Sequence, residues 1–60
     1  MKIRNFLKYV SQSTYIEVYH NNKRVFSGFA EKMDDELLDS WIKEDSAFPN
    51  TYGEMEIFIK

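Results

Sequence analysis

The segment from Met33 to Asp45 reads MDDELLDSWIKED, and it is the part of the chain that decides the expected fold. Its apolar residues recur with the 3.6-residue period of an amphipathic helix, while its charged residues fall on the opposite side. Asp34 is the expected N-cap, with Met33 and Leu38 spaced as a hydrophobic staple around it. The segment therefore predicts a helix over residues 33–45. Its apolar stripe consists of Leu37, Leu38, Trp41 and Ile42.

Acidic residues are concentrated in the same part of the chain. Residues 31–45, called the acidic segment below, contain seven carboxylates and two lysines, a net charge of −5, whereas the whole chain carries −2. Such a helix face is either a solvated surface or a negative array for a basic partner, and at its most specific its carboxylates would imitate DNA phosphates. The candidate partner-binding residues are Asp35, Glu36, Asp39, Trp41 and Glu44.

The rest of the chain predicts a second helix and three strands. Residues 15–20 and 54–60 alternate between apolar and polar side chains, as strands do. Asn21 and Asn22 tolerate the positive φ angles of a tight hairpin, so residues 24–30 return beside the first strand. The order αββαβ predicts an α+β fold with a three-stranded, mostly antiparallel sheet and both helices on one face, the last strand running antiparallel to the first. The N-terminal helix is expected from the spacing of Ile3, Phe6, Leu7 and Val10.

The hairpin register determines which side chains each face of the sheet presents. A two-residue loop would place Val18 opposite Val25 and Tyr15 opposite Gly28, and would bring Val25 and Phe29 to the face covered by the helices. A one-residue slip would exchange the two faces of the second strand. The opposite face has no helix left to cover it, and an uncovered apolar patch usually marks an interface with a second copy or with another protein. The expected homodimer interface consists of Tyr15, Tyr19, Phe26 and Phe58.

Composition restricts the classes of function. Residues 1–60 are expected to form one domain with a small core, so oligomerisation would help to stabilise it. The absence of cysteine and of any long apolar run predicts a cytoplasmic protein without disulfides, a signal peptide or a membrane span. His20 is the only histidine, and no G-x-S-x-G or glycine-rich phosphate motif is present. We therefore expect no metal, no cofactor and no catalytic site.

Several short stretches of the chain carry a resemblance to a known class. These are MKIRNFLKYVS, YIEVY, VFSGFA, LLDSWI and MEIFI, in that order along the whole chain. Together they resemble very small proteins encoded by phages and prophages of Gram-positive bacteria. Within that class, the order of elements and the acidic character are similar to the phage inhibitors of uracil-DNA glycosylase, which are dimeric DNA mimics. Small phage inhibitors of CRISPR nucleases and other host defences share this logic.

The resemblance implies that acidic residues imitate phosphates while an aromatic or apolar groove grips the enzyme's DNA-intercalating loop. Asp35, Glu36 and Asp39 would supply the carboxylates, and Trp41 or the aromatic residues of the sheet would supply the groove. The leading hypothesis is a phage-encoded, dimeric inhibitor of a host nucleic-acid-processing or defence protein, acting in the host cytoplasm.

Two other functions are compatible with the sequence. The first is a self-associating structural or assembly module with no host enzyme target, in which the acidic face serves only solubility. The second is direct nucleic-acid binding through Lys2, Arg4 and Lys8, and it would be salt-dependent. The net negative charge disfavours binding of nucleic acid on the aromatic sheet, because single-strand binders need cations along the backbone.

Overall fold

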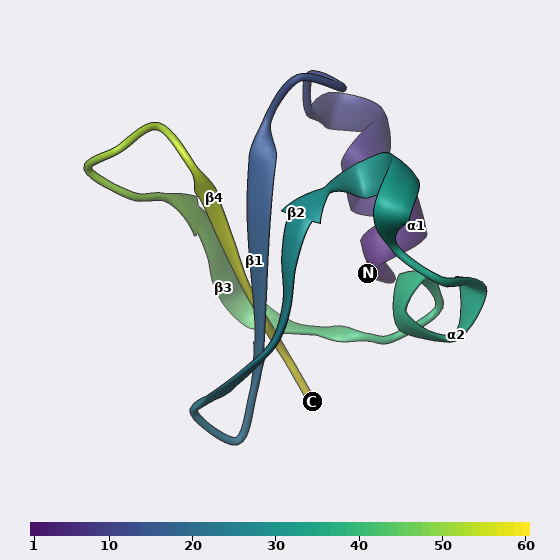
Figure 1. Ribbon diagram of the computed structural model, residues 1–60. Coiled ribbons are helices and arrows are strands. Elements are labelled where there is room, and N and C mark those ends of the chain that lie inside the picture. Colours follow the sequence, from purple (N-terminus) through teal and green to yellow (C-terminus); the bar gives the residue numbers. More distant parts are fainter.

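The computed structural model describes the backbone of residues 1–60 and every side chain except that of Asp45. The chain is α+β, and its strands form one mixed sheet (Figure 1). No helix in the described structure has the length and apolar character needed to cross a bilayer. The α-helices are α1 (Ile3–Phe6) and α2 (Asp35–Leu38), and the 3₁₀ helices are η1 (Leu7–Tyr9) and η2 (Ala30–Lys32). The strands are β1 (Tyr15–His20), β2 (Lys23–Phe29), β3 (Ile42–Pro49) and β4 (Met55–Ile59).

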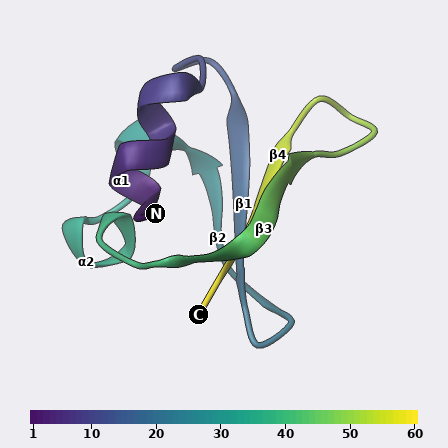
Figure 2. The same ribbon diagram turned by 180° about the vertical axis from the view of Figure 1, so that it is seen from behind.

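The sheet has four strands in the order β2-β1-β4-β3. The pairs β1–β2 and β3–β4 are antiparallel, whereas β1 and β4 run parallel at the centre. Figures 1 and 2 show α1 and α2 on one side of this sheet, but each has only four residues and is shorter than the sequence predicts. The predicted number of strands is wrong, because part of the expected helix and loop forms β3 instead.

The expected helix over residues 33–45 ends at Leu38, after a single turn. Its start is predicted correctly, since the Asp34 Oδ1 atom accepts a hydrogen bond from the Leu37 amide at 2.8 Å. Beyond the helix, the Ser40 carbonyl accepts from the Ile3 amide at 3.0 Å, and the Ile42 amide donates to the Met1 carbonyl at 2.9 Å. The N-terminal segment thus takes the backbone groups that a longer helix would use.

Strand β4 runs in the opposite direction to the one predicted. The rule that a crossover returns the chain parallel to its starting strand holds, but it applies to β3, which lies at the far edge of the sheet and runs parallel to β2. The β3–β4 hairpin then reverses the chain once more. One unforeseen strand therefore changes β4 from antiparallel to parallel with β1.

The β1–β2 hairpin has the predicted two-residue turn but not the predicted register. Asn21 and Asn22 have φ angles of 53° and 65°, the left-handed conformation that a tight hairpin requires. From the turn, His20 lies opposite Lys23 and Tyr19 opposite Arg24, but the next residue of β1, Val18, lies opposite Phe26. Val25 is therefore the extra residue of a β-bulge.

The bulge exchanges the two faces of β2 beyond Val25. Phe26 packs against the core, while Val25 and Phe29 are 50% and 43% exposed. The prediction that Val25 and Phe29 are core residues is wrong, and so is the placement of Phe26 on the uncovered face. Burial of the larger Phe26 ring in place of Val25 gives a physical reason for this register.

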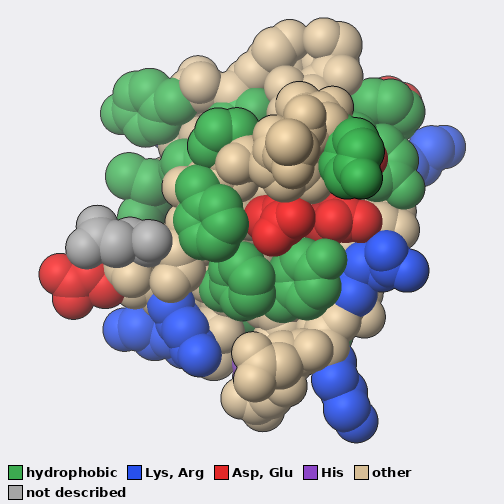
Figure 3. Space-filling model, turned by 90° about the vertical axis from the view of Figure 1, so that its left-hand side faces the viewer, with side chains coloured by type: hydrophobic (Ala, Val, Ile, Leu, Met, Phe, Trp, Pro, Cys, Tyr) green, Lys and Arg blue, Asp and Glu red, His purple; other side chains and the backbone are tan. Residues whose placement is uncertain are grey.

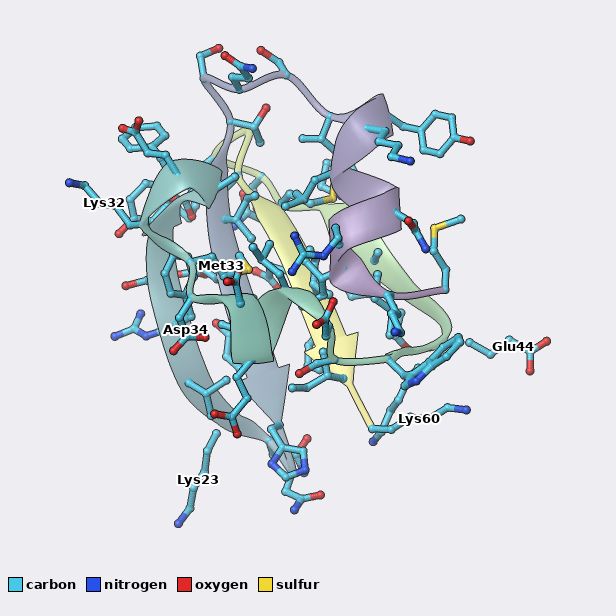
Figure 4. The ribbon with its side chains drawn as sticks, turned by 90° about the vertical axis from the view of Figure 1, so that its right-hand side faces the viewer. Lys23, Lys32, Met33, Asp34, Glu44 and Lys60 are labelled. Atoms are coloured by element: carbon cyan, nitrogen blue, oxygen red, sulfur yellow. The ribbon has the colours of Figure 1, made fainter. Side chains whose placement is uncertain are left out.

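The core lies between the sheet and the helices. Gly28, at a φ of +148°, faces it from β2, and the ring of Phe26 lies 3.5 Å from where a Cβ atom would be. An aromatic ring thus covers this glycine, but the ring is that of Phe26 and not of Tyr15, which lies opposite Phe29. Figure 4 shows Met33 turned inward and Lys32 pointing outward. The buried residues are Ile3, Ile16, Val18, Met33, Ile42, Ile57 and Ile59.

Candidate functional site

Three carboxylates at α2, those of Asp34, Asp35 and Asp39, accept hydrogen bonds within the chain. Arg4 of α1 donates from its Nε atom to Asp39 Oδ1 at 3.0 Å and from its Nη2 atom to Asp35 Oδ1 at 3.4 Å. The hydrogen bond from Arg4 lowers the pKa of Asp39 below its ordinary value. Asp34 is occupied as the N-cap. The basic N-terminal helix therefore neutralises part of the acidic segment.

The other members of the predicted partner-binding set are Glu36, Trp41 and Glu44, and they do not lie on one helix face. Glu36 is an exposed residue of α2. Trp41, which follows α2, is 53% exposed, and its backbone forms an isolated antiparallel β-bridge with that of Lys2. The Lys2 ammonium lies 5.7 Å from the centre of the indole ring. Glu44 belongs to β3 and points away from the molecule on the side opposite Asp34 (Figure 4). The structure brings Asp35 and Asp39 together around Arg4 and separates Glu44 from them.

The face of the sheet turned away from the helices carries a row of aromatic rings. The ring of Phe58 stacks on Tyr19 at 5.0 Å and on Phe48 at 5.7 Å between ring centres. Tyr15 and Phe29 form an edge-to-face pair at 5.6 Å. Three of the four predicted interface residues lie here, and Phe26 is the exception. We call this surface the outer face; its main members are Tyr15, Glu17, Tyr19, Arg24, Phe29, Phe48, Glu56 and Phe58.

Two carboxylates stand in the middle of the outer face. Glu17 of β1 and Glu56 of β4 are neighbours across the parallel ladder. Glu17 is only 14% exposed, and it accepts hydrogen bonds from the Tyr19 hydroxyl and from Arg24 Nη1, both at 3.2 Å. Figure 3 shows acidic side chains between two groups of hydrophobic side chains, with Lys and Arg at the margins.

Asn50, at the start of the β3–β4 turn, ties further carboxylates to this face. Its Nδ2 atom donates to Glu54 Oε1 at 2.9 Å and to Glu56 Oε2 at 3.2 Å. Its Oδ1 atom accepts from the backbone amides of Tyr52 and Glu54 at 2.9 and 3.0 Å, which fixes the orientation of the amide. Asn50 thus closes the turn and also holds Glu56 at the surface.

The phenol of Tyr19 is kept in its neutral form by this arrangement. Burial against its neighbours raises the pKa of Tyr19, and the negative charge of Glu17 and the hydrogen bond to it raise the pKa further. The Tyr19 hydroxyl is the donor in its hydrogen bond to Glu17. The outer face therefore combines flat rings with carboxylates in fixed positions.

The outer face presents stacked rings and a pair of neighbouring carboxylates. Among the side chains that the structure describes, no group of three or more His, Asp or Glu residues converges as a metal site would require. A hollow of about 580 Å³ lies between η1, η2, α2 and the end of β2, where Phe29 of the outer face also lines it. Its lining includes Leu7, Ala30 and Leu38.

Sequence reasoning missed several members of the outer face. Phe48 belongs to the strand that was not predicted, and Phe29 reached this face through the bulge. The positions of Glu17 and Glu56, in contrast, could be predicted from sequence, because the alternation of β1 and β4 points them outward beside Tyr19 and Phe58. Comparison of the chain with protein-family models, with curated protein sequences and with solved structures gives no significant match.

Proposed function

We propose that this chain is a non-catalytic binding protein that uses its outer face to hold another protein. The observation that carries the proposal is the row of stacked rings Tyr19, Phe58 and Phe48 on a sheet face that no described element covers. Exposed apolar patches mark interaction sites, and Tyr and Phe are enriched at the centres of protein interfaces.

The target we propose is a host nucleic-acid-processing or defence protein, inhibited by a phage-encoded partner. Proteins of that kind present basic grooves to nucleic acid, and the carboxylates among the outer-face rings suit a basic surface. The acidic helix has a smaller part in this version than the sequence suggests. Arg4 occupies Asp35 and Asp39, and Lys2 lies over Trp41, so the net negative field at α2 is reduced.

Self-association is the second candidate, and the same rings favour it, because a chain of 60 residues gains stability by covering an apolar face. The position of Glu17 and Glu56 opposes it. Two outer faces packed directly on one another would bring four carboxylates together, which costs free energy unless each is matched by a cation.

The test is retention of a protein from bacterial lysate by the tagged chain and by two matched variants. Phe48→Ser removes a ring from the outer face, where Phe48 is 44% exposed on the edge strand β3. Tyr52→Ser removes a ring that is 87% exposed in the β3–β4 turn. We expect a stoichiometric host protein with the wild type and with Tyr52→Ser, and its loss with Phe48→Ser.

Circular dichroism of each variant checks that the fold is retained, and light scattering on the purified chain gives its mass. A host protein held equally by all three forms would move the binding surface away from the outer face. A dimer that retains no host protein and is broken by Phe48→Ser would establish the self-association candidate instead.

A further inference from the structure

We propose that the outer face receives an arginine side chain of the protein partner, with the guanidinium at Glu56 and the aliphatic stem on the rings of Phe58 and Phe48. This inference rests on the proposed function and specifies the chemistry of the partner. It depends on how Glu56 is placed between like charge on one side and aromatic rings on the other.

The first argument is the cost of the arrangement in the free protein. Glu17 and Glu56 are paired residues of adjacent strands, and like charges in that position destabilise a sheet. The chain offsets the repulsion with donors from Arg24, Tyr19 and Asn50. Apolar or neutral side chains at these two positions would need no such network of hydrogen bonds. Residues that are unfavourable for folding are expected at functional sites.

The second argument is the uneven sharing of these donors. Glu17 receives a guanidinium and a phenol, one on each carboxylate oxygen. Among the side chains that the structure describes, Glu56 receives only the neutral amide of Asn50, through its Oε2 atom, and the same amide also serves Glu54. These side chains form a cluster of three carboxylates, Glu17, Glu54 and Glu56, with one cation, Arg24. The net charge of the cluster is therefore −2. That charge is centred on Glu56 and Glu54, away from Arg24.

The third argument is what surrounds Glu56 on the face. Phe48 is its partner across the antiparallel ladder, and Phe58 follows two residues later on the same side of β4. An arginine suits this setting better than other cations, because its planar group can meet a carboxylate through two donors while stacking on aromatic faces. Lysine lacks the planar fork, and a phosphate would be repelled.

The test is an NMR titration of the full chain with a blocked Leu-Arg-Leu peptide, followed through the backbone amides. The matched variants are Glu56→Gln and Glu31→Gln, which remove the same charge from the outer face and from η2 respectively. We expect shifts at β1 and β4 at about millimolar peptide, weakened about tenfold by Glu56→Gln and by less than about twofold by Glu31→Gln. Replacing arginine by citrulline, which is neutral and nearly the same shape, should abolish the shifts.

Three results would overturn the inference. These are equal binding by Glu56→Gln and wild type, equal binding of the citrulline peptide, and no shift with peptide at about 10 mM. The lysate experiment with the same variants separates this inference from the proposed function. A host protein lost with Phe48→Ser but retained by Glu56→Gln would leave the proposed function standing and refute the arginine site.

Discussion

The two faces of the central strands differ although their residues alternate along the same chain. On β1 and β4, Ile16, Val18 and Ile57 are fully buried beneath the helices. The residues between them, Glu17 and Glu56 among others, form a polar and aromatic surface. Among the described residues, the buried side chains of the inner face are all apolar. The outer face holds its carboxylates with hydrogen bonds from neighbouring side chains.

This difference shows which face the fold depends on. Removing a buried side chain costs the lost transfer free energy and leaves a cavity, whereas a half-exposed side chain is partly solvated already. Substitutions on the inner face should therefore act on stability, and those on the outer face on binding.

The largest expected effect comes from truncating neighbouring residues of β4. Ile57→Ala should lower the free energy of unfolding by about 2–5 kcal/mol. This is a large share of the roughly 3–9 kcal/mol expected for a chain of this size. Phe58→Ala should cost roughly 1–2 kcal/mol, since its ring is only partly buried. Urea unfolding followed by circular dichroism measures both, and Ile57→Val, at about 0.5–1.5 kcal/mol, keeps the measurement possible if the alanine variant does not fold.

The proposed difference between the two faces would be wrong if Phe58→Ala lowered the free energy of unfolding as much as Ile57→Ala. Such a result would mean that the outer face is covered in solution, as a second copy of the chain would cover it. The same unfolding experiment at several protein concentrations would then show a midpoint that rises with concentration.

The next effect in size concerns Gly28, which lies on β2 beyond the bulge at Val25. Gly28 has a φ of +148°, which side chains rarely adopt, so Gly28→Ala should destabilise the chain by about 1–3 kcal/mol through backbone strain. Ser27→Ala, at the neighbouring exposed position, should change stability by less than about 0.5 kcal/mol. Equal, small effects would mean that the backbone at residue 28 can adopt another conformation without loss.

The parts of the fold that follow from sequence are those that local chemistry determines. The alternation of β1, the Asn21-Asn22 turn, the Asp34 cap and the inward residues of β4 are all confirmed. The bulge at Val25 could not be predicted, because the choice between Val25 and Phe26 depends on the volume available beneath the helices. Strand β3 was missed because one helical turn followed by a strand places Leu37, Leu38 and Ile42 toward the same core as a long helix would.

The candidate site was predictable to a smaller extent. The outward positions of Tyr15, Tyr19 and Phe58 follow from their strands, and the structure places them on one uncovered face. The prediction that the acidic segment binds a partner did not take into account its pairing with Arg4, which lies more than thirty residues away in the sequence. Charge counted along a sequence omits such pairing, since only the tertiary fold brings α1 beside α2.

The smallest expected effect concerns the contact that holds the two helices over the inner face. Because Arg4 lowers the pKa of Asp39, the folded chain binds this proton less readily than the unfolded chain. Asp39 therefore stabilises the fold above its ordinary pKa of about 3.9, and this contribution is lost as pH falls through the lower, folded value. The effect should be slight and salt-sensitive, since Arg4 and Asp39 are 46% and 51% exposed. Carboxyl titration by NMR should show the pKa of Asp39 returning toward its ordinary value in Arg4→Gln but not in Lys8→Gln, which removes the same charge from η1. The same titration in both variants would mean that Arg4 does not hold α2 in solution, and that the inner face is covered by apolar packing alone.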